Sequence, residues 1–320
     1  MKRFMVVVGI LILILSIAAL VNQFLNLEYS NVNVIYVGGS GKGNLSSIKE
    51  AVDKAESGAT IYIYDGTYNE SNLTIDKDKI KIFGEGENAT IIVGFYKENQ
   101  TCHPVINVDA NNVYLKGFTI INGDFGIRIN GNNNVLENIE ITNLGINNTN
   151  CSNDLFGIAM YNSENNIISN STINNSNGLI LFDSNSNSIH KNNLTNNNIA
   201  FRIKGTSNNN LIYQNNFENN TQNAYDNSTN LWFNKNRGNF WDDYNGTDEN
   251  NDSIGDTAYI IPGGDNIDSY PLMKPYKKVK ESTDLIIDDF SLYTMLVIGM
   301  IVAIIFVLPI AYYWRKKYFT

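Results

Sequence analysis

The stretch NNVLENIEITNLG (Asn133–Gly145) decides the fold, because NNVYLKGFTIING (Asn111–Gly123) precedes it with the same order of asparagines and apolar residues. Three later segments share this pattern: NNIISNSTINNSN (Asn165–Asn177), SNSIHKNNLTNNN (Ser186–Asn198) and NNLIYQNNFENNT (Asn209–Thr221). Their apolar anchors are separated by 21, 32, 21, 23 and 23 residues, at Ile120, Ile141, Ile173, Leu194, Phe217 and Phe240. A period of about 22 residues with β-branched alternation predicts stacked coils of β-strand.

Each coil is predicted to contain a second strand, and the long 32-residue interval is predicted to hold an insertion at about Ile146–Leu155. The second strands are GIRIN (Gly126–Asn130), IAMYN (Ile158–Asn162), LILFD (Leu179–Asp183) and AFRIK (Ala200–Lys204). Side chains alternate between the two faces of a strand. The alignment therefore predicts a core face of Ile127, Ile129, Ala159, Tyr161, Ile180, Phe182, Phe201 and Ile203. It predicts an outward face of Arg128, Met160, Leu181 and Arg202.

Asparagine makes up 43 of the 150 residues from Thr101 to Asn250. Asparagine tolerates left-handed backbone angles, and its side chain can hydrogen-bond to the same position one coil away. We therefore expect these residues to occupy the corners between strands. The same composition creates fourteen N-x-S/T motifs from Asn44 to Asn251, so glycosylation is expected at some of them in an extracytoplasmic protein.

Both ends of the repeat carry candidate caps. Ser46–Ser57 has apolar residues at helical spacing behind a serine, which predicts a helix that covers the first coil. At the other end, GNFWDDYNGTDENNDSIGD (Gly238–Asp256) has six carboxylates and no basic residue. Its first half continues the repeat and its second half ends it, so this stretch is expected to close the last coil.

The run NLSSIKEAVDKAESGATIYIYDGTYNE (Asn44–Glu70), the asparagine-rich coils and the closing segment from Gly238 to Met273 carry a family resemblance. Over about Val34–Pro275 the chain resembles the right-handed parallel β-helix proteins of the NosD-like and pectin-lyase-like group, especially archaeal surface proteins. The resemblance implies the fold. It does not choose among activities, since this group includes polysaccharide lyases, hydrolases and epimerases, a copper-insertion accessory protein and surface proteins without a known role.

The catalytic patterns of that group are incomplete in this chain. Arg202-Ile203-Lys204 matches the last motif of the pectin hydrolases, but the nearby histidine, His190, lies in SIHKN rather than in a G-H-G. An enzyme of this fold would need a carboxylate and an arginine or lysine on adjacent coils, which linear sequence does not display. Soft copper ligands are few, with two cysteines, two histidines and the methionines Met160 and Met273 outside the apolar runs.

Two apolar runs predict membrane segments. Phe4–Val21 follows Lys2 and Arg3, and Leu292–Trp314 precedes a basic tail. Each run is near the length that a bilayer needs, and the basic flanks place both ends in the cytoplasm. The predicted organisation is a signal peptide or N-terminal anchor (1–27), an extracytoplasmic β-helix with its caps (28–276), a charged stalk (277–290), a transmembrane helix (291–314) and a cytoplasmic tail (315–320).

Three sites are expected from the residues. The outward set Arg128, Met160, Leu181 and Arg202 is a candidate patch for glycan or polypeptide. A calcium loop is expected from Asp248, Asn250, Asp252, Ile254 and Asp256, whose spacing places oxygens at positions 1, 3, 5, 7 and 9. Cys102 and Cys151 are expected to form a disulfide, with a metal site including His103 or free thiols as alternatives.

The sequence therefore predicts an all-β, membrane-anchored surface protein with a single or double membrane pass. Its expected role is to bind or organise cell-surface material, with a glycan or an S-layer protein as partner and calcium as the candidate cofactor. A polysaccharide-active enzyme and an accessory subunit of a membrane transporter are the alternatives. With a net charge of -9, a nucleic-acid partner is not expected.

Overall fold

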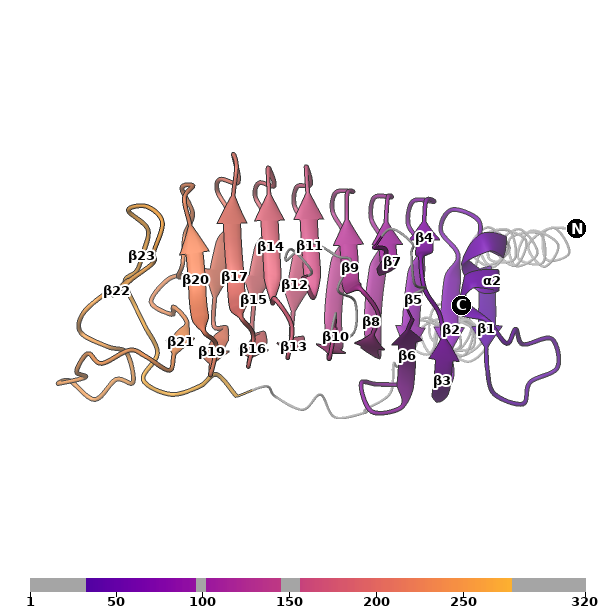
Figure 1. Cartoon of the computed structure of the whole chain (residues 1–320), viewed down its shortest axis with the longest axis horizontal. Helices are drawn as coiled ribbons and strands as arrows, with labels where there is room; N and C mark the ends of the chain where they lie inside the picture. The colour runs from indigo at the N-terminus through magenta and orange to yellow at the C-terminus, as the bar shows by residue number, and fades with distance from the viewer. Residues whose placement is uncertain (1–32, 96–101, 145–155, 278–320) are drawn as a thin grey trace, which may run out of the picture. The chain divides into compact units, whose positions relative to one another are not determined.

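Two parallel sheets wind into a β-helix in the computed structural model, which describes residues 33–95, 102–144 and 156–277. About eight turns lie within these residues. Figure 1 shows the coils side by side along one axis, from β1 (Val34–Val37) at one end to β21 (Phe240–Trp241) at the other. The predicted parallel β-helix is confirmed.

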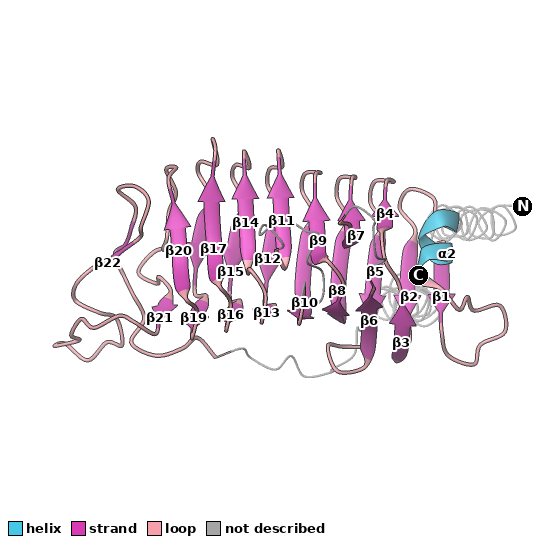
Figure 2. Cartoon of the chain, in the orientation of Figure 1, coloured by secondary structure: helices cyan, strands magenta, loops and turns pink. Residues whose placement is uncertain are grey.

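The two sheets, which we call sheet A and sheet B, account for most of the strands in Figure 2. The other strands of sheet A are β2 (Thr60–Ile63), β3 (Gly66–Asn69), β5 (Lys81–Gly84), β6 (Thr90–Gly94), β8 (Tyr114–Asn122), β10 (Val135–Thr142), β12 (Ile167–Ser169), β13 (Thr172–Asn174), β15 (Ser188–His190), β16 (Asn193–Thr195), β18 (Leu211–Tyr213) and β19 (Asn216–Glu218). Sheet B contains β4 (Leu73–Ile75), β7 (Pro104–Val108), β9 (Phe125–Ile129), β11 (Ile158–Tyr161), β14 (Leu179–Phe182), β17 (Ile199–Lys204) and β20 (Gln222–Asp226). An antiparallel pair, β22 (Tyr259–Ile260) and β23 (Ile267–Asp268), follows the last coil.

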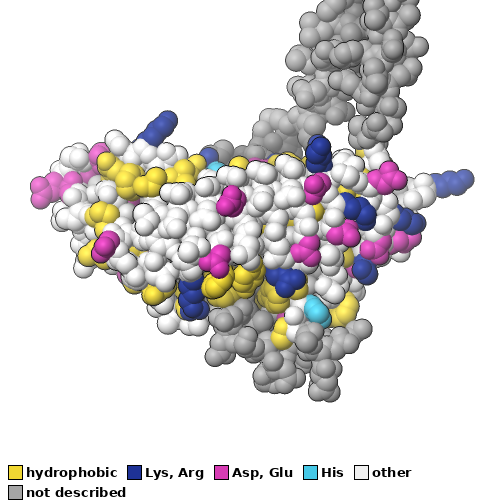
Figure 3. All heavy atoms as spheres, turned by 90° about the horizontal axis from the view of Figure 1, so that it is seen from above, with side chains coloured by type: hydrophobic (Ala, Val, Ile, Leu, Met, Phe, Trp, Pro, Cys, Tyr) yellow, Lys and Arg dark blue, Asp and Glu magenta, His cyan; other side chains and the backbone are white. Residues whose placement is uncertain are grey.

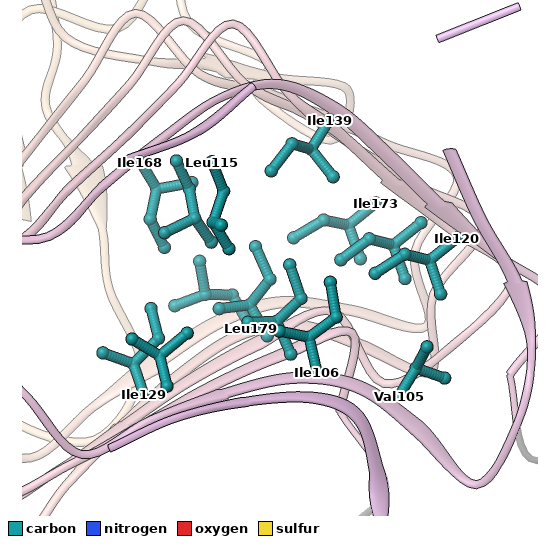
Figure 4. Packing of buried hydrophobic residues seen from close by; sticks show 14 of the residues in the cluster. Val105, Ile106, Leu115, Ile120, Ile129, Ile139, Ile168, Ile173 and Leu179 are labelled. Carbon is teal, nitrogen blue, oxygen red and sulfur yellow. The ribbon is translucent and has the colours of Figure 1, made fainter. Parts of the chain in front are cut away.

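The core is a column of apolar side chains between the sheets. Figure 4 shows residues of sheet A, such as Ile173 and Leu115, pointing toward residues of sheet B, such as Leu179 and Ile129. The anchor positions of sheet A pair in the expected order from Ile120 to Phe217, and all of them are fully buried. Each buried aliphatic side chain stabilises the fold by about 1.5–3 kcal/mol relative to exposure.

The last anchor was predicted one residue too early. Phe217 pairs with Trp241, and Phe240 pairs with Asn216. The interval is therefore 24 residues rather than 23, so Trp241 points into the core and Phe240 does not. A slip of one residue exchanges the two faces of a strand, because side chains alternate with a period of two.

Asparagine ladders close the corners of the later coils, as expected. In one ladder the side-chain oxygens of Asn166, Asn187 and Asn210 each accept the backbone N–H of the ladder residue one coil earlier, all at 2.8 Å. A second ladder runs through Asn192, Asn215 and Asn239. Each rung satisfies a buried backbone donor that no strand pairing would reach. On the face shown in Figure 3, most of the described surface is backbone or side chains that are neither charged nor hydrophobic.

The first coil is covered by α2 (Ile48–Lys54), which confirms the predicted capping helix. Ser47 is its N-cap, and the Ser47 side chain accepts the Glu50 N–H. The carboxylate of Glu70 accepts the backbone N–H of Ile48 at 2.6 Å and the Ser47 hydroxyl at 2.9 Å. A carboxylate at a helix N-terminus satisfies unpaired donors and opposes the positive end of the helix dipole.

The last coil is closed by aromatic rings and a buried carboxylate. Trp241 lies between Phe217 and Tyr259, with ring centroids 4.3 and 4.1 Å away and both pairs nearly parallel. Asp268 ends the second ladder by accepting the Asn239 N–H at 2.7 Å and the Trp241 indole N–H at 3.0 Å. The segment from Gly238 to Asp268 therefore closes the fold, as expected.

The chain divides into two compact units, Met1–Tyr276 and Lys277–Thr320. Nearly all described residues belong to the first unit. Both predicted membrane segments, Phe4–Val21 and Leu292–Trp314, lie outside the described residues and stay predictions. Among the residues that are described, no helix has the length and apolar character needed to cross a bilayer.

Candidate functional site

The outer face of sheet B differs from its prediction at two of four positions. Met160 and Leu181 are fully buried in the core, whereas Arg128 and Arg202 are half-buried on the outer face. The pairing shows the cause, since Ile158 and not Ala159 lies beside Ile127. The predicted patch of Arg128, Met160, Leu181 and Arg202 is therefore wrong as a continuous surface.

Two rows of side chains form the actual outer face. The first row, in register across the strands, is Asn107, Arg128, Ala159, Ile180, Arg202 and Tyr225. Tyr161, Phe182 and Lys204 form the second row, which begins beside Asn130. The predicted core positions Ala159, Tyr161, Ile180 and Phe182 thus all lie on the outer face of the sheet, where Ala159 and Ile180 are buried and Phe182 is 39% exposed.

A hydrogen-bonded polar cluster occupies the start of this face, on β7 and β9. The Arg128 guanidinium donates from Nε to the side-chain oxygen of Asn107 at 2.8 Å. The amide of Asn107 donates to Asp109, and the amide of Asn130 donates to the other oxygen of the same carboxylate. Asn107 is buried, while Asp109 and Asn130 are exposed. The Asn107 side chain therefore connects a carboxylate to an arginine on the adjacent coil, an arrangement that linear sequence could not display.

Apolar and aromatic side chains continue the face beyond the polar cluster. The rings of Tyr161 and Phe182 are 6.2 Å apart and tilted. Beside them, Phe156, Ala159 and Ile180 form a small apolar cluster that is separate from the core. The Arg202 guanidinium lies 5.8 Å from the centre of the Phe156 ring, which is within the range of a cation–π contact. Along this face, the hydrogen-bonding groups are followed by the aromatic rings and by the Arg202 cation, with Phe156, Ala159 and Ile180 buried between them.

A second titratable cluster lies on the outer face of sheet A. The Lys116 ammonium lies 3.4 Å from the Glu137 carboxylate, which also accepts the Tyr114 hydroxyl. Burial acts to raise the pKa of Glu137, but these contacts outweigh it and leave that pKa below its usual range. His190, stacked on Tyr213 at 4.9 Å, has its pKa lowered by burial and by the charge of Lys191. The side chains of this cluster are half-buried, and they form two groups, one around Glu137 and the other the His190–Tyr213 stack.

In the expected calcium loop, the carboxylates accept hydrogen bonds from backbone N–H groups of the loop itself. Asp248 accepts the N–H groups of Asp252 and Ser253 at 3.1 and 2.9 Å, and Asp252 accepts that of Ile254 at 2.8 Å. The Asp256 carboxylate accepts the N–H of Glu249 at 2.7 Å. Within the described ranges, no three Asp, Glu, His or Cys side chains are grouped as a metal site. The structure does not support calcium, which stays a prediction together with Asn250 as its ligand.

The described cysteine, histidine and methionine side chains do not form one cluster. Cys102 is disulfide-bonded, and Cys151 lies outside the described residues, so their pairing stays a prediction. His103 precedes β7, and its backbone N–H donates to the buried Asp124 at 3.0 Å. His190 lies on sheet A, and Met160 is buried in the core. These soft side chains do not converge, so the described residues do not fit a copper site.

Sequence reasoning missed Asn107, Asp109, Asn130, Tyr161 and Phe182 as residues of this outer face. The glycines Gly126, Gly157 and Gly178 offered a better alignment, because Gly157 and Gly178 directly precede β11 and β14 and Gly126 is the second residue of β9. A Cβ on Gly126 would lie 2.3 Å from the Gly157 carbonyl oxygen, so the close approach of the coils requires glycine there. Aligning the three glycines places Tyr161 and Phe182 outside.

Comparison with known proteins adds a family. A model of the family described as periplasmic copper-binding protein (NosD) matches residues 42–246. No curated protein matches the chain. Similar solved structures include a pectin methylesterase from carrot, at 15% identity over 67% of this chain and 78% of that chain with a TM-score of 0.38. Pectin methylesterase PemA from Erwinia chrysanthemi has 12% identity over 57% and 71%, with a TM-score of 0.34. An alginate lyase from Paenibacillus has 13% identity over 62% and 95%, with a TM-score of 0.36. TM-scores this low carry no argument about activity.

Proposed function

This chain belongs to the family of periplasmic copper-binding protein (NosD), and from that premise we propose that it is an extracytoplasmic module that binds glycan on the outer face of sheet B. The observation that carries the proposal is the juxtaposition of the Asp109–Asn107–Arg128 hydrogen bonds with the half-buried Tyr161 ring and the exposed Phe182 ring. Sugar rings offer hydroxyl groups at their edges and C–H groups on their faces. Carboxylate, amide and guanidinium groups hydrogen-bond to the hydroxyl groups, and aromatic rings pack against the C–H faces.

The form of the surface favours a polymer over a small molecule. The strands of sheet B are about 4.8 Å apart, so the run from Asn107 to Arg202 crosses five strands and spans about 19 Å. Arg128, Arg202 and Lys204 add positive charge, which suits carboxylated sugars. The copper named in the family description is not part of this proposal, because the described soft ligands do not converge.

A glycan array probed with the full-length chain in detergent tests the proposal. Replacing both rings (Tyr161→Ala with Phe182→Ala) should weaken binding at least about tenfold, which corresponds to about 1.4 kcal/mol. Asn130→Ala should weaken it by a smaller factor. The matched control is Tyr36→Ala, which removes a tyrosine that is 43% exposed on sheet A.

Two outcomes would overturn this function. If binding survives the double substitution and is lost in Tyr36→Ala, the ligand lies on sheet A. If mass analysis shows that bound glycans are shortened, the protein is an enzyme. Asp109 with Arg128 on the adjacent coil is the observation that favours that second candidate. Asp109→Asn should then abolish cleavage while retaining the glycan.

Attachment to a membrane belongs to the same proposal and rests on the two apolar runs of the sequence. Alkaline extraction of membranes should leave the full-length chain in the membrane fraction. Removal of residues 292–314 should release it if the N-terminal run is cleaved as a signal peptide. Retention after this deletion would indicate a second anchor at Phe4–Val21.

A further inference from the structure

The asparagines of the ladders and the asparagines of the N-x-S/T motifs are different residues. Two positions after a ladder asparagine the chain enters a strand with its side chain in the core, as Ile168 follows Asn166 and Leu194 follows Asn192. An N-x-S/T motif needs a hydroxyl at that position. The ladder pattern therefore excludes the motif, and glycan attachment would not compete with the corners of the fold.

Eleven of the fourteen motifs lie in the described residues, and their two ends differ in exposure. Both the asparagine and the hydroxyl residue are exposed in four of them: Asn219 with Thr221, Asn227 with Thr229, Asn245 with Thr247, and Asn251 with Ser253. At least one end is half-buried or buried in the motifs of Asn44, Asn69, Asn72, Asn88, Asn170, Asn174 and Asn193. The four open motifs all belong to the last coil and the closing segment.

Two closed motifs show how the fold blocks an acceptor. Asn88 is exposed, but Thr90 is fully buried, and its hydroxyl donates to Ile63 O at 3.2 Å and accepts the Glu85 N–H at 3.0 Å. Asn193 is half-buried within β16, and its side-chain oxygen accepts the Asn216 amide at 2.7 Å. An enzyme that must reach both the amide and the hydroxyl cannot engage these motifs without opening the coil.

Among the open motifs, the acceptor amide is hydrogen-bonded to a described residue at Asn251 and not at the other three asparagines. The Asn251 amide donates to the Glu249 carbonyl at 3.5 Å, and Ser253 has a positive φ. The side-chain amides of Asn219, Asn227 and Asn245 make no hydrogen bond to another described residue. In addition, none of the eleven described acceptor asparagines lies on a strand of sheet B, so glycans would leave that face open.

We infer that Asn219, Asn227 and Asn245 are N-glycosylation sites that accept sugar on the folded chain. The donor is an oligosaccharide joined through its anomeric carbon to a polyprenyl phosphate or diphosphate. In the transfer, the bond between Nδ2 and the anomeric carbon forms, and the bond from that carbon to the phosphate oxygen breaks. The phosphate leaves with the electron pair of that bond, and the amide loses one proton to a base.

The test compares folded and urea-unfolded full-length chain as acceptors for a solubilised oligosaccharyltransferase with its lipid-linked donor. Glycopeptide mass spectrometry measures the occupancy of each motif. In the folded chain, Asn219, Asn227 and Asn245 should be at least about tenfold more occupied than Asn88 and Asn193, because the closed motifs need local opening. Unfolded chain, returned briefly to low urea for the reaction, should lose this preference.

Variants that lack one acceptor asparagine show which motif carries the glycan. Asn219→Gln should remove one increment of glycan mass from the folded chain, and Asn193→Gln should remove none. Equal occupancy of Asn88, Asn193 and Asn219 in the folded chain would overturn the inference. It would also be overturned if the folded chain were unmodified at the three sites, whether or not the unfolded chain is an acceptor. Glycan binding on sheet B can fail independently of these results.

Discussion

The coils before Asn132 and the coils after it close their corners in different ways. In the early coils each corner has its own contact, such as the Thr90 hydroxyl bonds or the left-handed Gly117, where a Cβ would lie 2.7 Å from the Gly84 carbonyl oxygen. In the later coils one contact is repeated, from Asn166 to Asn187 to Asn210. After the insertion this repeated contact accompanies coil lengths of 21, 23 and 24 residues, so the pattern of asparagines and apolar residues recurs along the later half.

The largest expected effect comes from breaking a ladder in the later half. Asn215→Ala removes the acceptor of the Asn192 N–H at 3.0 Å and the donor to the Ile189 carbonyl at 2.9 Å. These buried groups would have no replacement partner, so we expect a loss of about 3–6 kcal/mol in the free energy of unfolding. Urea unfolding followed by tryptophan fluorescence measures this loss.

Two controls sharpen the comparison between the halves. Thr90→Val breaks an individual corner in the early half and should cost about 1–2 kcal/mol. The exposed Asn198, whose side chain is outside the ladders, should change stability by less than about 0.5 kcal/mol when replaced by alanine. Equal losses for Asn215→Ala and Asn198→Ala would show that the ladders do not stabilise the later coils.

The next largest effect on stability tests the register of the last strand of sheet A. Trp241 is buried between two rings, so Trp241→Ala should cost about 3–5 kcal/mol. Its neighbour Phe240 is half-buried and points outward, so Phe240→Ala should cost less than about 1.5 kcal/mol. The same denaturant titration measures both. A larger loss for Phe240→Ala would contradict the observed register and restore the 23-residue interval.

A pH-dependent effect distinguishes the closing segment from the rest of the later half. Burial raises the pKa of Asp268 from 3.8 to about 6. The folded chain therefore binds this proton more tightly than the unfolded chain does. The stability that Asp268 contributes is complete below pH 3.8 and is lost as pH rises through about 6, with a change of up to about 3 kcal/mol.

Asp268→Asn isolates this contribution, because an amide does not titrate. The variant should lose less stability than the wild-type chain between pH 4 and pH 7, measured by urea unfolding at each pH. His190 is a separate influence of opposite sign, since its lowered pKa makes stability rise with pH. Parallel pH profiles for the variant and the wild-type chain would show that Asp268 does not titrate in this window.

The smallest effect concerns the acidic loop beyond the last coil. If calcium binds there, millimolar calcium should raise the melting temperature by a few degrees, corresponding to about 1 kcal/mol. Asp252→Ala should abolish the rise, and Asp265→Ala, an exposed carboxylate outside the loop, should retain it. No rise in the wild-type chain would exclude calcium as a stabilising ligand.

The β-helix could be predicted from the later coils because apolar anchors and asparagines repeat together. The outer face of sheet B could not be predicted, because the number of residues between paired positions of neighbouring coils differs between the two sheets. Across the insertion, 31 residues separate Ile127 from Ile158 in sheet B, whereas 32 separate Ile141 from Ile173 in sheet A. Applying the 32-residue interval of sheet A to sheet B assigned the side chains of β11 and β14 to the wrong face.

By itself, the sequence determined the coil, its caps and the use of asparagine at corners, because each follows from the chemistry of single residues and a repeated spacing. Only the tertiary structure decided which of two adjacent side chains faces the core, as with Trp241 and Phe240. It also decided which carboxylates meet a cation on the next coil, as Asp109 does with Arg128 through Asn107. The physical reason is that strand side chains alternate every residue, whereas turn lengths vary by one residue from coil to coil.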